Sequence, residues 1–164
     1  MPIYEFTQTG ISRLEATTFS RAGLLERRDL QRLLRENVEV VAPDSLVIAE
    51  EFGEWEDSRR RIDLLAIDKA ANLVVIELKR TEDGGHMDLQ SIRYASMVST
   101  MTFDQAVDTF GRYLKQLGKD GQDSRATILN FLDWDGPEDG SFAKDVRIIR
   151  RRSFPKKLHP PFSG

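Results

Sequence analysis

The sequence contains no cysteine, only two histidines, no long apolar run and no strong charge of either sign. Without cysteine, disulfide bonds and thiolate chemistry are excluded. No apolar stretch approaches 18 residues and no secretory signal is present, so we expect no membrane span and a cytoplasmic location by default. The net charge of −3 argues against non-specific coating of nucleic acid, although local patches can still bind phosphate.

The composition is that of an ordinary globular protein. The chain has 164 residues, which is enough for one domain with a real core. Of these residues 40% are hydrophobic and 31% are charged, as is usual for a globular protein. We expect that single domain over residues 1–150. Residues 151–164 hold basic pairs and prolines and look like an irregular basic tail.

The chain is organised around two short apolar runs, residues 62–67 and 73–78. Both are rich in Ile, Leu and Val, and a polar break at 68–72 separates them. Runs of this length around a turn signal predict a β-hairpin that is buried on both faces.

Three charged residues interrupt this apolar pattern: Asp63, Glu77 and Lys79. A buried charge is costly unless it is paired or binds a metal. Side chains alternate along a strand, so Glu77 and Lys79 share a face. Because Asp63 lies near the start of the first strand and Glu77 near the end of the second, the hairpin should bring both carboxylates and the ammonium to one end of the sheet.

Such a grouping has a chemical use and an alternative explanation. Two carboxylates can hold Mg²⁺ or Mn²⁺, and a neighbouring lysine can orient or deprotonate a water or stabilise a charged phosphorane. The alternative is a structural ion pair at the rim of the sheet, and spacing alone leaves both interpretations open.

Asp63 followed by Glu77-Leu78-Lys79 on the next strand resembles the PD-(D/E)XK nuclease superfamily, with Ile62-Asp63 in place of the usual Pro-Asp pair. The longer string EEFGEWEDSRRRIDLLAIDKAANLVVIELKRTEDGGHMDLQSIRYASMVS is similar to bacterial relatives of the archaeal NucS-type endonuclease catalytic domain. The resemblance covers about residues 23–150. It implies an α/β fold with a restriction-endonuclease-like αβββαβ core, a mixed central sheet flanked by helices.

The resemblance also implies further site residues on two helices. The periodicity of residues 22–36 predicts an amphipathic helix, and Glu26 near its start matches the acidic residue that this superfamily often adds to the metal site. On its own, Glu26 would read as a solvated first-turn acid. Gln31 matches as well, without a defined role. On a helix at 87–100, Gln90 and Tyr94 share a face; the resemblance points Gln90 at the site, and a core-edge polar pair is the alternative.

Three consecutive arginines, Arg59, Arg60 and Arg61, precede the hairpin. Beside a metal site they suit phosphate contacts, and Tyr94 is a further candidate for contact with nucleic acid. A solvated loop, or neutralisation of nearby acids, is the alternative for each arginine. Glu50 and Glu51 end the preceding strand, where one could face the site or both could be exposed strand-end acids.

The remaining elements follow from periodicity and turn signals. Residues 1–20 suggest an edge strand or hairpin, residues 45–52 a core strand, and residues 103–117 an amphipathic helix. Residues 126–132 fit a short helix or a strand, and 146–149 a last strand.

The tail permits two interpretations. It could be a basic arm that grips nucleic acid. It could also reflect truncation or a shifted reading frame, because reading two bases later from Arg151 permits an amphipathic continuation. In that case a C-terminal segment of the natural protein is missing.

Taken together, these patterns and the resemblance predict a Mg²⁺- or Mn²⁺-dependent DNA endonuclease of repair or defence type, acting on phosphodiester bonds. Asp63 and Glu77 would ligate the metal, with Glu26, Lys79 and Gln90 completing the site. The partner would be DNA, with no membrane, and a homodimer is one candidate assembly. The alternative is a catalytically silent nucleic-acid-binding or regulatory module on a nuclease fold.

Overall fold

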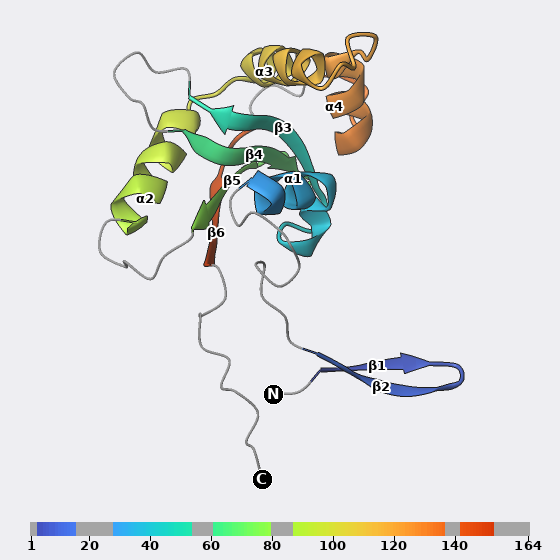
Figure 1. Ribbon diagram of the computed structural model, residues 1–164. Helices are drawn as coiled ribbons and strands as arrows, with labels where there is room; N and C mark the ends of the chain where they lie inside the picture. Colours follow the sequence, from blue (N-terminus) through green and yellow to red (C-terminus); the bar gives the residue numbers. More distant parts are fainter. Residues whose placement is uncertain (1–2, 16–27, 54–60, 80–86, 137–141, 153–164) are drawn as a thin grey trace.

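The computed structural model describes residues 3–15, 28–53, 61–79, 87–136 and 142–152. It contains a four-stranded mixed sheet with helices packed around it, and a separate two-stranded sheet (Figure 1). The expected α/β class is confirmed, and the order of helix, three strands, helices and strand is the one expected for an αβββαβ core.

The main sheet has the order β3–β4–β5–β6. Its strands are β3 (Ser45–Phe52), β4 (Ile62–Asp68), β5 (Leu73–Lys79) and β6 (Val146–Arg152). Neighbours are antiparallel except for the parallel pair β5 and β6, which needs a long crossover. The crossover contains the helices α2 (Met87–Val98), α3 (Phe103–Gln116) and α4 (Ser124–Leu132). Before β3 come α1 (Arg28–Glu36) and the short turn η1 (Val38–Val40).

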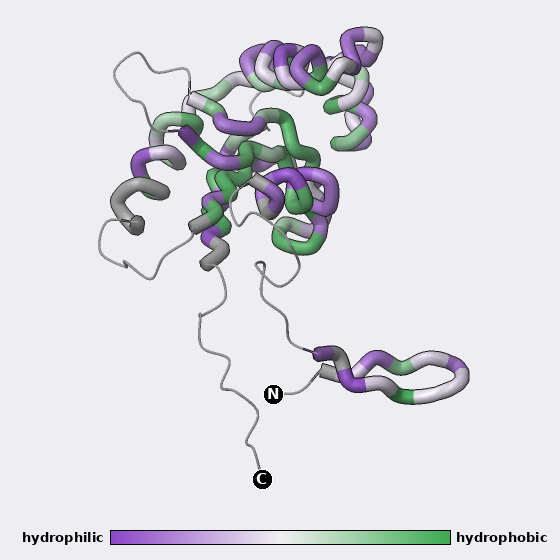
Figure 2. The backbone as a smooth tube through the Cα atoms, viewed as in Figure 1, coloured by the Kyte–Doolittle hydropathy of each residue, from purple (hydrophilic) through white to green (hydrophobic). Residues whose placement is uncertain are grey.

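The core is centred on β4 and β5. All seven residues of β4 are buried, and Leu64, Leu65, Ile67 and Ile76 have no exposed surface. Figure 2 shows the apolar residues gathered along these central strands. Full burial of such a side chain contributes about 1.5–3 kcal/mol, so this hairpin is a main source of stability. Burial on both faces, as predicted, follows from its central place in the sheet.

Local signals explain where several elements begin and end. The predicted strand at 45–52 is β3, and residues 126–132, for which a helix and a strand were both considered, belong to the helix α4. The start of α4 is fixed by Asp123, whose Oδ1 accepts from the Ala126 N–H at 3.0 Å. The N-terminal residues form a hairpin of β1 (Ile3–Thr7) and β2 (Gly10–Leu14). The last strand extends through Arg152, beyond the expected 146–149 and past the expected start of the tail.

Asp68 organises the turn between β4 and β5. The sequence pattern placed it in the polar break, but it is the last residue of β4 and only 5% exposed. Its Oδ1 accepts from the Ala70 and Asn72 N–H groups at 3.0 Å, and its Oδ2 accepts from Arg147 Nη1 at 2.9 Å. Burial acts to raise the pKa of Asp68, but the hydrogen bonds from Arg147 and Asn72 outweigh it and lower that pKa.

We predict that Asp68→Asn lowers the free energy of unfolding by about 1–2 kcal/mol at pH 7, because it loses a charge-assisted bond to a half-exposed arginine. A lowered folded pKa stabilises the fold above the unfolded value of about 3.9, and this contribution disappears as the pH falls through the lower folded value. The difference in melting temperature between wild type and variant should therefore shrink below about pH 4.

The matched control is Asp133→Asn, which changes an 81% exposed carboxylate paired with Lys69. An exposed pair of this kind contributes little, so the control should melt within a degree or two of wild type. A difference for Asp68→Asn that is the same at pH 7 and pH 3 would contradict this role of the Asp68 charge.

Candidate active site

Asp63 and Glu77 lie side by side at one end of the main sheet. Leu64 pairs with Ile76, so continuing the antiparallel register by one residue sets Asp63 opposite Glu77. Each residue is 5% exposed, and the Leu78 N–H donates to Asp63 Oδ2 at 2.6 Å. The expectation that Asp63 and Glu77 meet at one end of the sheet is confirmed, and we call these two residues the acidic pair. The third expected member of the group, the Lys79 ammonium, lies outside the described residues.

The carboxylate of Asp63 is held by the strands and a helix that surround it. The backbone pairing of β4 with β5 ends at Leu64 and Ile76. Just beyond that point, the Leu78 N–H donates to the side chain of Asp63. Gln31 of α1, itself 5% exposed, donates from Nε2 to the backbone oxygen of Asp63 at 3.3 Å. Gln31 was singled out from the sequence without a role; the structure gives it one in anchoring Asp63.

The electrostatics of the acidic pair favour a cation. Taking a carboxylate out of water costs several kcal/mol, and two neighbouring carboxylates also repel each other. Carboxylate oxygens are the ligands that hard cations such as Mg²⁺ and Mn²⁺ prefer. The chemistry of the pair therefore fits a divalent ion.

The acidic pair supplies only part of a coordination shell. Within residues 3–15, 28–53, 61–79, 87–136 and 142–152, no three His, Cys, Asp or Glu side chains gather closely enough to hold a metal. An ion held by Asp63 and Glu77 would take its further oxygen ligands from water, from a phosphate, or from residues outside these ranges such as Glu26.

The two glutamates at the end of β3 have different surroundings. Glu50 pairs with Leu64 in the register, and its Oε2 accepts from Arg35 Nη1 at 2.9 Å, which ties α1 to the sheet. Glu51 is exposed, lies level with Asp63, and has a φ of +50°, which is strained for a residue other than glycine. Such strain is found more often near functional sites.

The other sequence-predicted residues are only partly described. Lys79 ends β5 and Gln90 lies on α2, but their side chains fall outside the described residues, as do Glu26, Arg59 and Arg60 altogether. Arg61 is exposed, and its Nη1 donates to the Gly53 backbone oxygen at 2.8 Å. The roles of these residues remain predictions.

Tyr94 is 2% exposed and belongs to the hydrophobic core. Its side chain therefore does not present a surface to nucleic acid in this structure. The burial favours the alternative considered for this helix face, a residue at the edge of the core, over a DNA contact.

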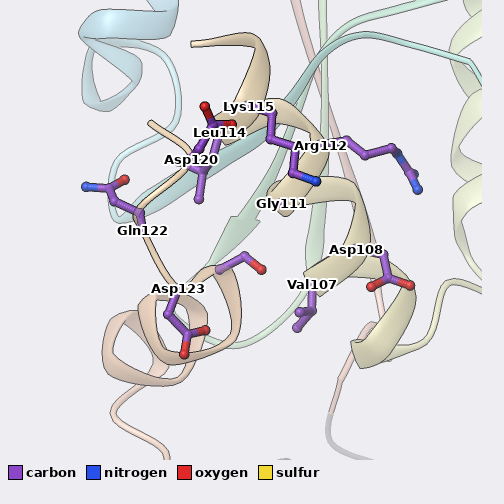
Figure 3. Close-up of a pocket in the computed structure, with 10 residues that line it drawn as sticks. Val107, Asp108, Gly111, Arg112, Leu114, Lys115, Asp120, Gln122 and Asp123 are labelled. Carbon is purple, nitrogen blue, oxygen red and sulfur yellow. The ribbon is translucent and has the colours of Figure 1, made fainter. Parts of the chain in front are cut away.

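A cavity of about 430 Å³ is lined by α3, the loop that follows it and the start of α4 (Figure 3), and neither Asp63 nor Glu77 is among its lining residues. Its walls carry both signs of charge, including Asp108, Arg112 and Lys115. The two helices approach closely here, as shown by the 3.3 Å that would separate a Cβ atom added at Gly111 from Ser124 Oγ. The mixed lining does not define one ligand chemistry.

No family model and no curated protein matches this chain. A solved structure described as an EndoMS–dsDNA2 complex is similar to it over 90% of this chain and 52% of that one, with 19% identity and a TM-score of 0.39. The chain thus spans about half the length of that relative. No helix in the described part of the chain is long and apolar enough to cross a membrane.

We predict that Asp63→Ala and Asp63→Asn differ in stability without metal. Both changes remove the charge, but Asp63→Ala also leaves the buried Leu78 N–H without its acceptor, so its free energy of unfolding should be about 1–3 kcal/mol lower than that of Asp63→Asn. Asp63→Asn keeps an oxygen in that position and therefore keeps an acceptor for the Leu78 N–H. Thermal unfolding in EDTA checks this, and equal melting temperatures for the two variants would show that the bond does not anchor Asp63.

Proposed function

We propose that this chain is a metal-dependent endonuclease that hydrolyses phosphodiester bonds in DNA. The observation that carries the proposal is the acidic pair, two buried carboxylates brought together by the register of β4 and β5. The resemblance of Asp63 and Glu77-Leu78-Lys79 to the PD-(D/E)XK pattern supports the same chemistry.

In this proposal Asp63 and Glu77 hold Mg²⁺ or Mn²⁺, which when bound neutralises charge on the phosphate and lowers the pKa of a bound water. Leu78 and Gln31 keep Asp63 in place through its side chain and its backbone. Lys79 orients the attacking water or takes its proton. The water oxygen bonds to phosphorus, the opposite ester bond breaks, and the departing sugar oxygen gains a proton.

The remaining roles concern the surroundings of the reacting phosphate. Glu26 completes the metal shell and Gln90 supports the metal-bound water or a phosphate. Arg59, Arg60 and Arg61 contact the DNA backbone. With a net charge of −3 the chain has no general attraction for DNA, so these local arginines would supply much of the binding.

The alternative function is a nucleic-acid-binding or regulatory module without turnover. The structure describes only two carboxylates at the site, which suits that alternative unless Glu26 or water completes the shell. The two functions differ in metal dependence. Branched, mismatched and single-stranded DNA incubated with and without Mg²⁺ or Mn²⁺ distinguishes them, since only the nuclease cuts, and only with metal.

We predict that Glu77→Gln abolishes metal-dependent cleavage and changes DNA affinity by no more than a few fold. The change removes a charged metal ligand but no phosphate contact, and loss of one electrostatic group of this kind costs about 100-fold or more in rate. Single-turnover cleavage and filter binding measure the two effects.

Glu39→Gln is the matched control, because Glu39 is an exposed glutamate on η1. It should cut DNA at the wild-type rate. Wild-type cleavage by Glu77→Gln would remove Glu77 from the mechanism.

We predict that Lys79→Met reduces the single-turnover rate about 100-fold while metal affinity stays close to wild type. Methionine keeps an apolar stem and removes the charge. Lys69→Met is the control at the other end of the same hairpin, where Lys69 is exposed and pairs with Asp133. If Lys79 only balances charge in the fold, its variant should lose thermal stability without metal, recover it when metal is added, and still cut.

A further inference from the structure

Arg150 of β6 lies in register with Glu77 across the parallel pair of strands. Residues paired in this way project to the same face, and neighbouring strands lie about 4.8 Å apart. Since Asp63 adjoins Glu77 on the other side, Asp63, Glu77 and Arg150 form a row across three adjacent strands. The two carboxylates are buried, whereas Arg150 is exposed.

Arg147 on the same strand provides a contrast. It pairs with Val74 in the register, three residues from Arg150, and therefore projects to the opposite face. Its Nη1 donates to Asp68 Oδ2 at 2.9 Å, which holds the turn between β4 and β5. The last strand thus carries one arginine with a structural role at the turn end of the hairpin and one beside the acidic pair.

The chemistry of Arg150 suits a phosphate. A guanidinium offers a planar fork of donors that matches phosphate oxygens and keeps its charge at any physiological pH. A strand in a sheet also positions a side chain more rigidly than a loop does. An exposed arginine next to buried carboxylates can hold the anionic substrate against the cation that those carboxylates bind.

We propose that Arg150 binds a backbone phosphate of DNA at the acidic pair and positions the scissile phosphodiester over it. This inference rests on the proposed nuclease function. It adds to the proposed site a residue of β6, the strand that follows the crossover helices. The competing role is purely structural, in which Arg150 only offsets the charge of Glu77 in the fold. The two roles differ in salt dependence, rate and stability.

The test compares wild type with Arg150→Gln and Arg150→Lys, using a double-stranded oligonucleotide. For Arg150→Gln we expect the slope of log affinity against log salt to fall by about 0.9, one phosphate contact. We expect the single-turnover rate with Mg²⁺ to fall about 100-fold while melting temperature and Mn²⁺ affinity stay unchanged. Arg150→Lys should keep the slope but lose part of the rate, because it lacks the fork.

Lys119→Gln, a change of an exposed lysine just after α3, controls for the loss of one positive charge and should behave as wild type. An unchanged salt slope in Arg150→Gln would overturn the phosphate contact, as would a lowered melting temperature with a wild-type rate. If Arg150→Gln does not fold, a wild-type rate in Arg150→Lys overturns the positioning role and a reduced rate supports it. Wild type that never cuts would refute the nuclease function, while the salt slope would still decide the Arg150 contact.

Discussion

The hydrogen bond from the Leu78 N–H to Asp63 Oδ2 determines how the rest of the site is arranged. It fixes a buried carboxylate at the edge of the β4–β5 ladder, directly beside Glu77. Burying two carboxylates side by side opposes folding by several kcal/mol, against a typical total stability of about 5–15 kcal/mol. A hydrophobic hairpin with almost no exposed surface offsets this, which makes the strongest part of the core the support for the site.

The two ends of β4 each carry a buried aspartate, and they serve different purposes. Asp68 accepts hydrogen bonds from two backbone N–H groups and from Arg147, so its charge is satisfied within the fold. Asp63 accepts from the Leu78 N–H and stands next to the carboxylate of Glu77. The first arrangement holds the turn between β4 and β5, whereas the second brings together two carboxylates, whose oxygens are ligands that a hard divalent cation prefers. This difference separates a structural carboxylate from a candidate metal ligand on the same strand.

The sequence predicted contacts that depend on alternation within one hairpin and missed those between distant segments. The meeting of Asp63 and Glu77 follows from a period of two and a short turn. The bond from Arg147 to Asp68 joins residues 79 apart through a parallel crossover, which no local pattern encodes. The place of Gln31 beside Asp63 likewise depends on how α1 lies on the sheet. Tyr94 was a candidate DNA contact because helical spacing gives a shared face without saying whether that face is inside.

The central claim is that Asp63 and Glu77 together form one divalent-cation site. Isothermal titration of Mn²⁺ into wild type, Asp63→Asn, Glu77→Gln and the double variant tests it most directly. The account predicts one Mn²⁺ site per chain. Either single variant should bind Mn²⁺ about 30-fold or more weakly than wild type, which corresponds to about 2 kcal/mol. The double variant should bind little more weakly than the single variants, since the two ligands act as a unit. Binding that is equally tight in wild type and both single variants would contradict the account.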